Sequence, residues 1–161
     1  MPMLRPYVLV VDDNKITTKL MRRYLEGNGF ETDEAGDGVE CLEKVQQRLP
    51  DAIILDVMMP RMDGFETVRA LKSQDQTRHI PVAIVTALND LATQLKAVEA
   101  GADDFLTKPI EEKLLLTKAA MLTELSQARQ HIQILRSVVD AYAAGDAARA
   151  QEILATIGLP T

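Results

Sequence analysis

Residues 7–11 read YVLVV and run directly into Asp12 and Asp13. An unbroken run of apolar, mostly β-branched residues is typical of a strand that is buried on both faces of a sheet. The run is far shorter than the roughly 20 residues that span a bilayer. The acidic pair that follows it also excludes the core of a signal peptide. This stretch therefore predicts a central strand with a polar end.

Further along the chain, strand-like and helix-like segments alternate. Turn, capping and glycine residues separate them: Asn14 and Asp37 can begin helices, as can Asp63 and either Asn89 or Asp90. The expected strands are residues 7–11, 30–34, 52–55, 82–86 and 104–107, and the expected helices are 15–26, 38–49, 64–73, 91–100 and a long one from about 111. This order predicts an α/β fold of the (βα)5 type, a doubly wound parallel sheet within the first 120 residues.

The composition narrows the class of protein. The 161 residues include 18 Lys and Arg against 24 Asp and Glu, for a formal charge of −6, and a single cysteine. One cysteine excludes a disulfide framework and a cysteine-based zinc site. An acidic chain without a basic cluster is a poor candidate for direct binding of nucleic acid. We expect a cytoplasmic protein that contacts neither nucleic acid nor membrane.

Side chains suited to chemistry stand where the predicted strands end. Sites in doubly wound folds form outside the carboxyl ends of the strands. Here these ends carry Asp12 with Asp13, then Asp56, Thr86 and Lys108. Carboxylates about 5 Å apart repel by roughly 3 kcal/mol per pair at an effective dielectric near 20, so the cluster needs a counter-cation. Hard oxygen ligands favour Mg²⁺ or Mn²⁺.

A divalent cation, a lysine and a hydroxyl at one point can also receive a phosphoryl group. Asp56, the lone carboxylate at the end of the central strand, is the best candidate for the nucleophile. Each residue also has an ordinary interpretation. Asp12 and Asp13 could cap a helix, Thr86 could be a simple β-former, and Lys108 with Pro109 could form a turn. Their coincidence at neighbouring strand ends favours the site.

Four segments together resemble the receiver domain of bacterial two-component response regulators, the CheY-like family. They are VLVVDDN (8–14), IILDVMMPRMDGFE (53–66), VAIVTALND (82–90) and GADDFLTKPI (101–110). The resemblance covers about residues 5–120 and implies strand order 2-1-3-4-5. It also implies that Asp56 accepts a phosphoryl group from a histidine of a sensor kinase or phosphotransfer protein.

The resemblance also implies roles for other positions. Asp12 and Asp13 would bind Mg²⁺ with Asp56 and the backbone carbonyl of Met58. The phosphoryl and switch positions would be Thr86, Ala87, Lys108 and Phe105, and the Lys108–Pro109 bond is expected to be cis. Phe105 occupies an aromatic switch position that is Tyr in many relatives, so a hydrogen bond from that ring is lost. The alternative interpretation of Phe105 is that its ring simply packs in the core.

The helix beyond the expected receiver, residues 1–122, has an apolar stripe of its own. Residues 123–161 are expected to form a helical extension for dimerisation or connection, broken near Gly145 and Asp146 before a short last helix at about 147–157. A heptad pattern predicts a parallel coiled coil, with Lys118 as a polar exception. Alternatively, the stripe packs back on its own domain. The expected seam is Met121, Leu125, Ala128, Ile132, Leu135, Val139 and Tyr142.

Three functions compete on the sequence. The first is a phosphoacceptor switch, not a true enzyme, that signals through contacts with an unknown downstream protein. The second is a Mg²⁺-dependent aspartyl-phosphate phosphohydrolase. Such enzymes use a second acid/base carboxylate two residues after the nucleophile, where this chain has Met58. The third is the receiver part of a larger regulator. The chain lacks the glycine-rich motif of nucleotide-binding folds, so that class is set aside.

Overall fold

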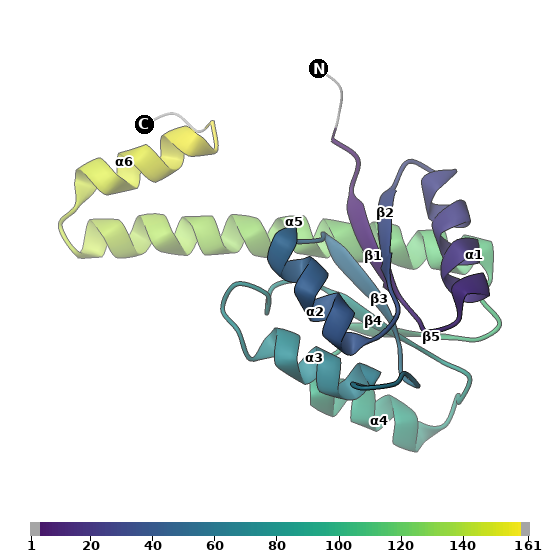
Figure 1. Ribbon diagram of the computed structural model, residues 1–161. Coiled ribbons are helices and arrows are strands. Elements are labelled where there is room, and N and C mark those ends of the chain that lie inside the picture. Colours follow the sequence, from purple (N-terminus) through teal and green to yellow (C-terminus); the bar gives the residue numbers. More distant parts are fainter. Residues whose placement is uncertain (1–3, 159–161) are drawn as a thin grey trace. The chain divides into compact units, whose positions relative to one another are not determined.

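The computed structural model describes residues 4–158, so the outermost residues of both expected segments, 1–3 and 159–161, lie outside the described part. Strands and helices alternate along the chain (Figure 1). In order they are β1 (Tyr7–Val11), α1 (Lys15–Glu26), β2 (Glu31–Ala35), α2 (Gly38–Gln47), β3 (Ala52–Asp56), α3 (Gly64–Lys72), β4 (Val82–Thr86), α4 (Leu91–Ala100), β5 (Asp104–Thr107), α5 (Glu112–Ala143) and α6 (Ala147–Thr156).

The strands form one parallel sheet in the order β2-β1-β3-β4-β5. The predicted (βα)5 fold and strand order are confirmed. In register, Val11 lies beside Leu55, and Thr86 beside Thr107. The strands therefore end at one edge of the sheet, which brings the polar residues that follow them close together.

Helices cover the two faces of the sheet separately. On one face, Val8 and Val10 of β1 pack with Met21 of α1 and with Leu115 and Leu122 of α5. On the other face, Leu9 and Leu55 pack with Cys41 of α2, Val68 of α3 and Ala97 of α4. Alternate residues of each inner strand thus face opposite cores, which is why those strands are apolar without interruption.

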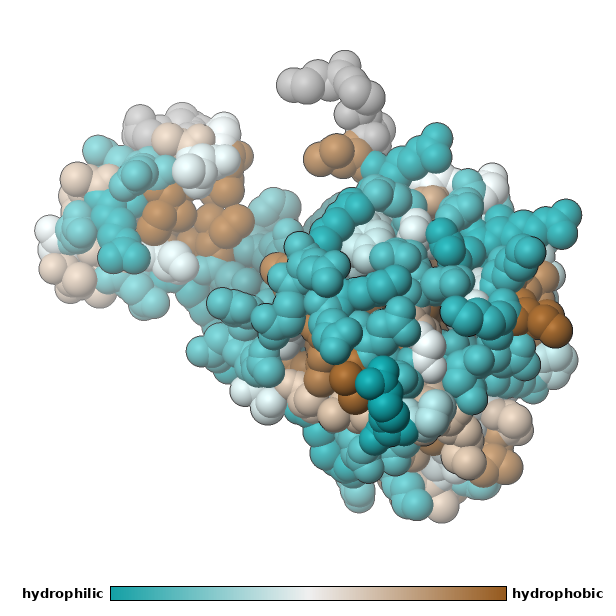
Figure 2. Space-filling model, viewed as in Figure 1, coloured by the Kyte–Doolittle hydropathy of each residue, from teal (hydrophilic) through white to brown (hydrophobic). Residues whose placement is uncertain are grey.

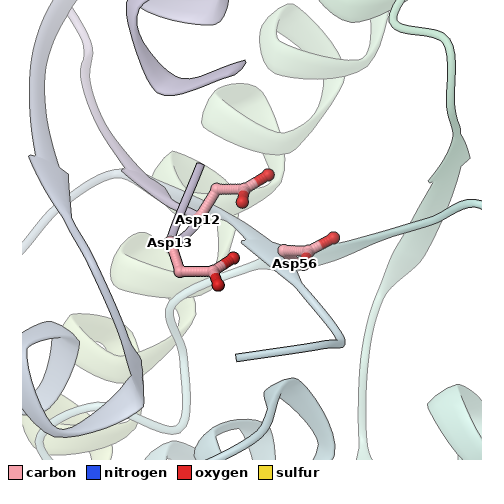
Figure 3. A group of neighbouring side chains, drawn as sticks. All are labelled: Asp12, Asp13 and Asp56. Carbon is pink, nitrogen blue, oxygen red and sulfur yellow. The ribbon is translucent and has the colours of Figure 1, made fainter. Parts of the chain in front are cut away.

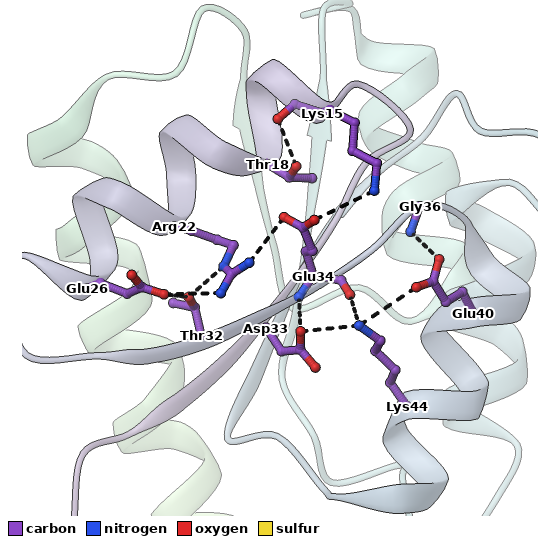
Figure 4. Close-up of polar contacts among 10 residues, drawn as sticks. All are labelled: Lys15, Thr18, Arg22, Glu26, Thr32, Asp33, Glu34, Gly36, Glu40 and Lys44. Atoms are coloured by element: carbon purple, nitrogen blue, oxygen red, sulfur yellow. Dashed lines mark hydrogen bonds and ion pairs between the residues drawn. The ribbon is translucent and has the colours of Figure 1, made fainter.

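The edge strand β2 is held in a different way. Arg22 of α1 donates to Thr32 at 3.0 Å and pairs with Glu34 at 3.3 Å (Figure 4). From the other side, Lys44 of α2 pairs with Asp33 at 3.2 Å. Polar contacts with both flanking helices explain why a segment with little apolar character is nevertheless a strand. Its bounds lie one residue later than predicted.

Most helix ends match their predicted caps. Asp37 and Asp63 accept from the backbone N–H three residues on, at 2.9 and 2.8 Å. Asp90, rather than Asn89, caps α4, and Gly101 ends that helix at φ 100°. Helix α2 ends at Gln47 and not at 49, because Arg48 turns to extended backbone.

The chain divides into two compact units, Met1–Ser126 and Gln127–Thr161. The first unit extends beyond the expected end at 122, because Thr123 and Ser126 are also buried. None of the helices in residues 4–158 combines the length and apolar character that crossing a membrane requires.

In the second unit, the end of α5 and helix α6 pack together. Val138 and Ala141 of α5 contact Ala150 of α6, flanked by Ile153 and Leu154, and hydrophobic residues gather between the two helices in Figure 2. The expected short last helix is therefore present. Gly145, at φ 78°, makes the turn that precedes it.

The residues of the predicted seam are all exposed in the single chain. Exposure is 51% for Ile132 and 64% for Val139, and the others are also open to solvent. Lys118 does not belong to this stripe, because its ammonium bonds Asp104 at 2.7 Å and the carbonyl of Phe105 at 3.0 Å. Among residues 4–158, the seam residues from Met121 to Tyr142 thus keep their side chains open to solvent.

Candidate functional site

Three carboxylates meet at the carboxyl ends of β1 and β3. Oxygens of Asp12, Asp13 and Asp56 lie within 4.8 Å of one another (Figure 3). Asp12 and Asp56 are only 1% and 5% exposed, whereas Asp13 is open to solvent. The arrangement follows from the register, because β1 and β3 are adjacent and end together. It concentrates negative charge at one edge of the sheet.

Lys108 lies between two of these carboxylates. Its Nζ atom is 3.2 Å from Asp12 Oδ2 and 3.1 Å from Asp56 Oδ1. Its backbone N–H donates to the carbonyl of Thr86 at 2.9 Å, which anchors it to β4. The bond from Lys108 to Pro109 is cis. The lysine therefore reaches the cluster from the end of β5.

The pKa values in this cluster reflect both burial and charge. Burial, followed by the neighbouring Asp12 carboxylate, raises the pKa of Asp56, although Lys108 opposes that change. Burial acts to lower the pKa of Lys108, but Asp56 and Asp12 outweigh it and leave that pKa raised. Lys108 thus stays protonated at neutral pH and compensates only part of the carboxylate charge.

The backbone behind Asp56 is closely packed. A Cβ atom at Gly64 would lie 2.4 Å from the carbonyl oxygen of Asp56, so only glycine fits there. The N–H of Gly64 donates to the carbonyl of Val57 at 2.9 Å, and Val57 donates to Val85 of β4 at 3.2 Å. The start of α3 therefore supports the position of Asp56 directly.

Thr86 is 6% exposed at the end of β4. Its hydroxyl accepts from the N–H of Leu88 at 3.0 Å, and Ala87 between them is open to solvent. A cavity of about 380 Å³ opens beside Asp56, large enough for a small phosphorylated group. Its lining includes the expected Thr86, Ala87 and Lys108 together with Val57, Met58, Phe65, Leu88, Thr93 and Lys96.

Besides Val57 and Leu88, which directly follow predicted site residues, three lining residues on helices were not found from the sequence. Phe65 lies in α3, and Thr93 and Lys96 lie in α4. None of them follows a strand, so a search of strand ends passes over them. The side chain of Met58 is 78% exposed. The role of its carbonyl as a cation ligand stays a prediction.

Phe105 is half-buried on β5, away from the acidic cluster. The ammonium of Lys118 lies 5.5 Å above the centre of its ring. The ring also lines a second cavity, of about 300 Å³, between α4 and β5 together with Leu91, Leu95 and Val98. Phe105 therefore lines this second cavity and not the cavity beside Asp56.

The donor set suits a hard divalent cation. Carboxylate oxygens on converging strands are the ligands that Mg²⁺ and Mn²⁺ prefer, with water completing the coordination. Asp12, Asp13 and Asp56 carry three formal charges, and Lys108 neutralises one of them. The residues therefore fit a small divalent ion by charge and by ligand chemistry.

Comparisons with known proteins point to one family. The response regulator receiver domain model matches residues 8–120. Response regulator PleD of Caulobacter vibrioides is 44% identical over 116 residues, 72% of this chain and 26% of that protein. Response regulator MprA of Mycobacterium sp. strain KMS is 41% identical over 120 residues, 74% of this chain and 51% of that protein.

Comparison with solved structures points to the same family. Chemotaxis response regulator CheY4 of Vibrio cholerae has a TM-score of 0.71 and 33% identity, over 74% of this chain and 99% of that one. This chain spans only about a quarter of PleD and half of MprA. Receiver domains in general bind Mg²⁺ at an acidic pocket, are phosphorylated on aspartate by histidine kinases and act as switches. With the sheet, the acidic cluster and these matches in agreement, the chain belongs to the response regulator receiver family.

Proposed function

We propose that this chain is a phosphoacceptor switch in which Asp56 receives a phosphoryl group from a partner histidine kinase or phosphotransfer protein. The observation that carries this proposal is the position of Asp56, buried beside two further carboxylates and paired with Lys108 at 3.1 Å. A buried nucleophile with a fixed cation beside it is prepared for charge that develops on a phosphoryl group. We assign the reaction to the cytoplasm.

In the transfer, a carboxylate oxygen of Asp56 attacks phosphorus as the bond from phosphorus to the donor histidine nitrogen breaks. The product is an acyl phosphate, and the histidine leaves as the neutral imidazole after taking up a proton. Mg²⁺ or Mn²⁺ would be held by Asp12, Asp13, Asp56 and the carbonyl of Met58, and would supply charge neutralisation. Lys108 remains to pair with the phosphoryl oxygens.

The negative charge added at Asp56 would change the conformation of the neighbouring backbone. The Thr86 hydroxyl lies on the same cavity as Asp56, and Ala87 and Leu88 follow it toward α4. A hydroxyl that turns toward the phosphoryl group would change its bond with Leu88 and the course of this segment. Phe105 would respond through the surface of α4 and β5, where an unknown downstream protein would bind.

Two alternatives differ in measurable ways. A phosphohydrolase would need an acid/base carboxylate where Met58 stands, so we favour the switch. Released phosphate separates them, because a switch gives about one phosphate per chain whereas an enzyme turns over repeatedly. Since relatives such as PleD and MprA extend beyond the matched region, this chain could also serve as the receiver part of a larger regulator.

We further propose that residues 123–161 join two copies of the chain. The exposed seam runs along α5, with Leu125, Ile132 and Val139 at a positions. In a parallel pair, Glu124 at g would face Arg129 at the following e position. Met121, Ala128, Leu135 and Tyr142 would complete the contact at d positions.

Phosphorylation by acetyl phosphate tests the main proposal. With Mg²⁺, intact-mass spectrometry of the wild type should show the addition of one phosphoryl group, and Asp56→Asn should show none. Asp75→Asn is a matched control, because Asp75 is an exposed aspartate that pairs with Arg78 at 3.1 Å, on the segment after α3. Phosphorylation of the Asp56 variant to the wild-type level would refute the assignment.

A further inference from the structure

The loop between β3 and α3, residues 57–63, contains an unusual backbone conformation. Arg61 has φ 64°, and among residues 4–158 it alone has positive φ without being glycine. The left-handed region costs an ordinary side chain about 1–2 kcal/mol. Such a conformation persists where surrounding contacts determine it. The contacts of Arg61 therefore indicate what fixes this loop.

Arg61 is held by an aspartate from another part of the fold. Its Nε atom donates to Asp37 Oδ2 at 2.8 Å, and its Nη2 atom lies 2.7 Å from the same oxygen. The other oxygen of Asp37 caps α2 by accepting from the N–H of Glu40. The Asp37 side chain is only 12% exposed. The ion pair therefore fixes Arg61 to the residue that caps α2.

A second contact joins the same two segments. A Cβ atom at Gly38, the first residue of α2, would lie 2.8 Å from Cγ of Met62 and 2.1 Å from the Thr67 hydroxyl. The start of α2 therefore touches both the loop and α3. Together, Arg61 on Asp37 and Met62 on Gly38 hold the loop against α2 at two consecutive residues.

We propose that Arg61 and Asp37 are positioning residues for the divalent cation. By fixing the loop after Asp56, their ion pair places the backbone of Met58 where it can join the three carboxylates around the ion. This inference rests on the proposed cation site. It gives a function to an arginine whose side chain pairs with Asp37, which lies outside the cluster of Asp12, Asp13 and Asp56.

The direction of the change in Mg²⁺ affinity distinguishes a positioning role of Arg61 from a purely electrostatic one. Arg61 carries positive charge near a site for a cation, so its charge alone weakens cation binding. If charge were its only influence, Arg61→Asn would tighten Mg²⁺ binding. If the arginine holds the loop, the same change loosens the ligand set and weakens binding. Asn adopts positive φ readily, so the substitution adds no backbone strain.

The experiment is a titration of the unphosphorylated protein with Mg²⁺ alone. The chain has no tryptophan, so calorimetry and amide NMR shifts serve as readouts. Arg61→Asn should weaken binding by about 3- to 10-fold, at or below the low end of the roughly 10- to 100-fold effects of residues that bond metal ligands directly. Arg78→Asn is the charge-matched control, because Arg78 also pairs with one aspartate but lies on the exposed segment after α3, and it should leave affinity unchanged.

Further variants test the pair. Asp37→Asn keeps the helix cap, since asparagine caps as well as aspartate, but removes the charge that binds Arg61. It should weaken Mg²⁺ binding alone and add nothing in the double variant with Arg61→Asn. Losses that add in the double variant would refute a joint role. Arg61→Lys should recover part of the affinity.

Arg61→Gly distinguishes positioning from general stability. Glycine relieves the strained φ, so urea unfolding should show no loss of stability while Mg²⁺ affinity still falls. Affinity of Arg61→Asn equal to or tighter than that of the wild type overturns this inference and leaves the phosphoacceptor proposal intact. A wild type that binds no Mg²⁺ overturns the cation site and this inference together.

Discussion

The Nζ atom of Lys108 lies 3.1 Å from the Oδ1 atom of Asp56. The carboxylate is 7% exposed and the lysine side chain 29%, so the pair is largely removed from solvent. A positive charge therefore stands beside the proposed phosphoacceptor, which would avoid reorganisation during transfer. The same pair offsets only part of the repulsion in the cluster, and that excess charge has consequences for stability.

Asp13→Asn should stabilise the chain when no divalent cation is present. The substitution removes one of three carboxylates that lie within 4.8 Å, and because Asp13 is exposed we expect a gain of about 1 kcal/mol in the free energy of unfolding. Urea unfolding with EDTA measures it. Added Mg²⁺ should stabilise the wild type more than the variant. Asp75→Asn should change neither value, and a destabilised Asp13 variant would contradict the prediction.

Ile132→Asp should prevent dimerisation. Ile132 is 51% exposed at the middle of the proposed seam, and a charge at an a position disfavours a coiled coil. Light scattering after size-exclusion chromatography should give a dimer for the wild type and a monomer for the variant. Gln133→Asp, one residue off the seam, should remain dimeric. A monomeric wild type would refute the coiled coil.

A chain that ends at Ser126 should fold by itself. It retains the α5 residues Ala119 and Leu122, which are buried against β1 and β4. A chain that ends at Lys118 loses both, at about 1.5–3 kcal/mol for the leucine alone. Urea unfolding should therefore show a clear loss for the shorter chain. Equal stability of the two would contradict the boundary at 126.

Cys41 should resist thiol reagents in the folded chain. Its side chain is fully buried, and burial raises the pKa of its thiol to about 12. Because the thiolate is the reactive form, reaction with a disulfide reagent at pH 8 should be about 1000-fold slower than in urea. Cys41→Ser should show no reaction under either condition. A fast reaction of the folded chain would place this thiol outside the core.

The fold and the acidic cluster could be predicted because they depend on local patterns. Each inner strand is recognised by its run of apolar residues. Parallel strands end at the same edge of the sheet, so the polar residues at their ends can be expected to lie together. Arg61 and Lys118 could not be placed in this way. Their contacts, with Asp37 and with Asp104, join segments that only the packed structure brings together. Nothing in the neighbouring sequence marks the positive φ of Arg61.

Strand β2 has a consequence for how the sheet behaves in solution. Its polar side chains Thr32, Asp33 and Glu34 contact Arg22 and Lys44, and only Ala35 of the strand is buried in the core. Ion pairs near the surface weaken as salt rises, because the Debye length is only about 10 Å at 0.1 M. Amide hydrogen exchange in β2 should therefore accelerate with ionic strength while β1 and β3 stay protected. Strand β2 is thus a salt-sensitive edge of the sheet, at the opposite end of the strand order from β5, which carries Phe105.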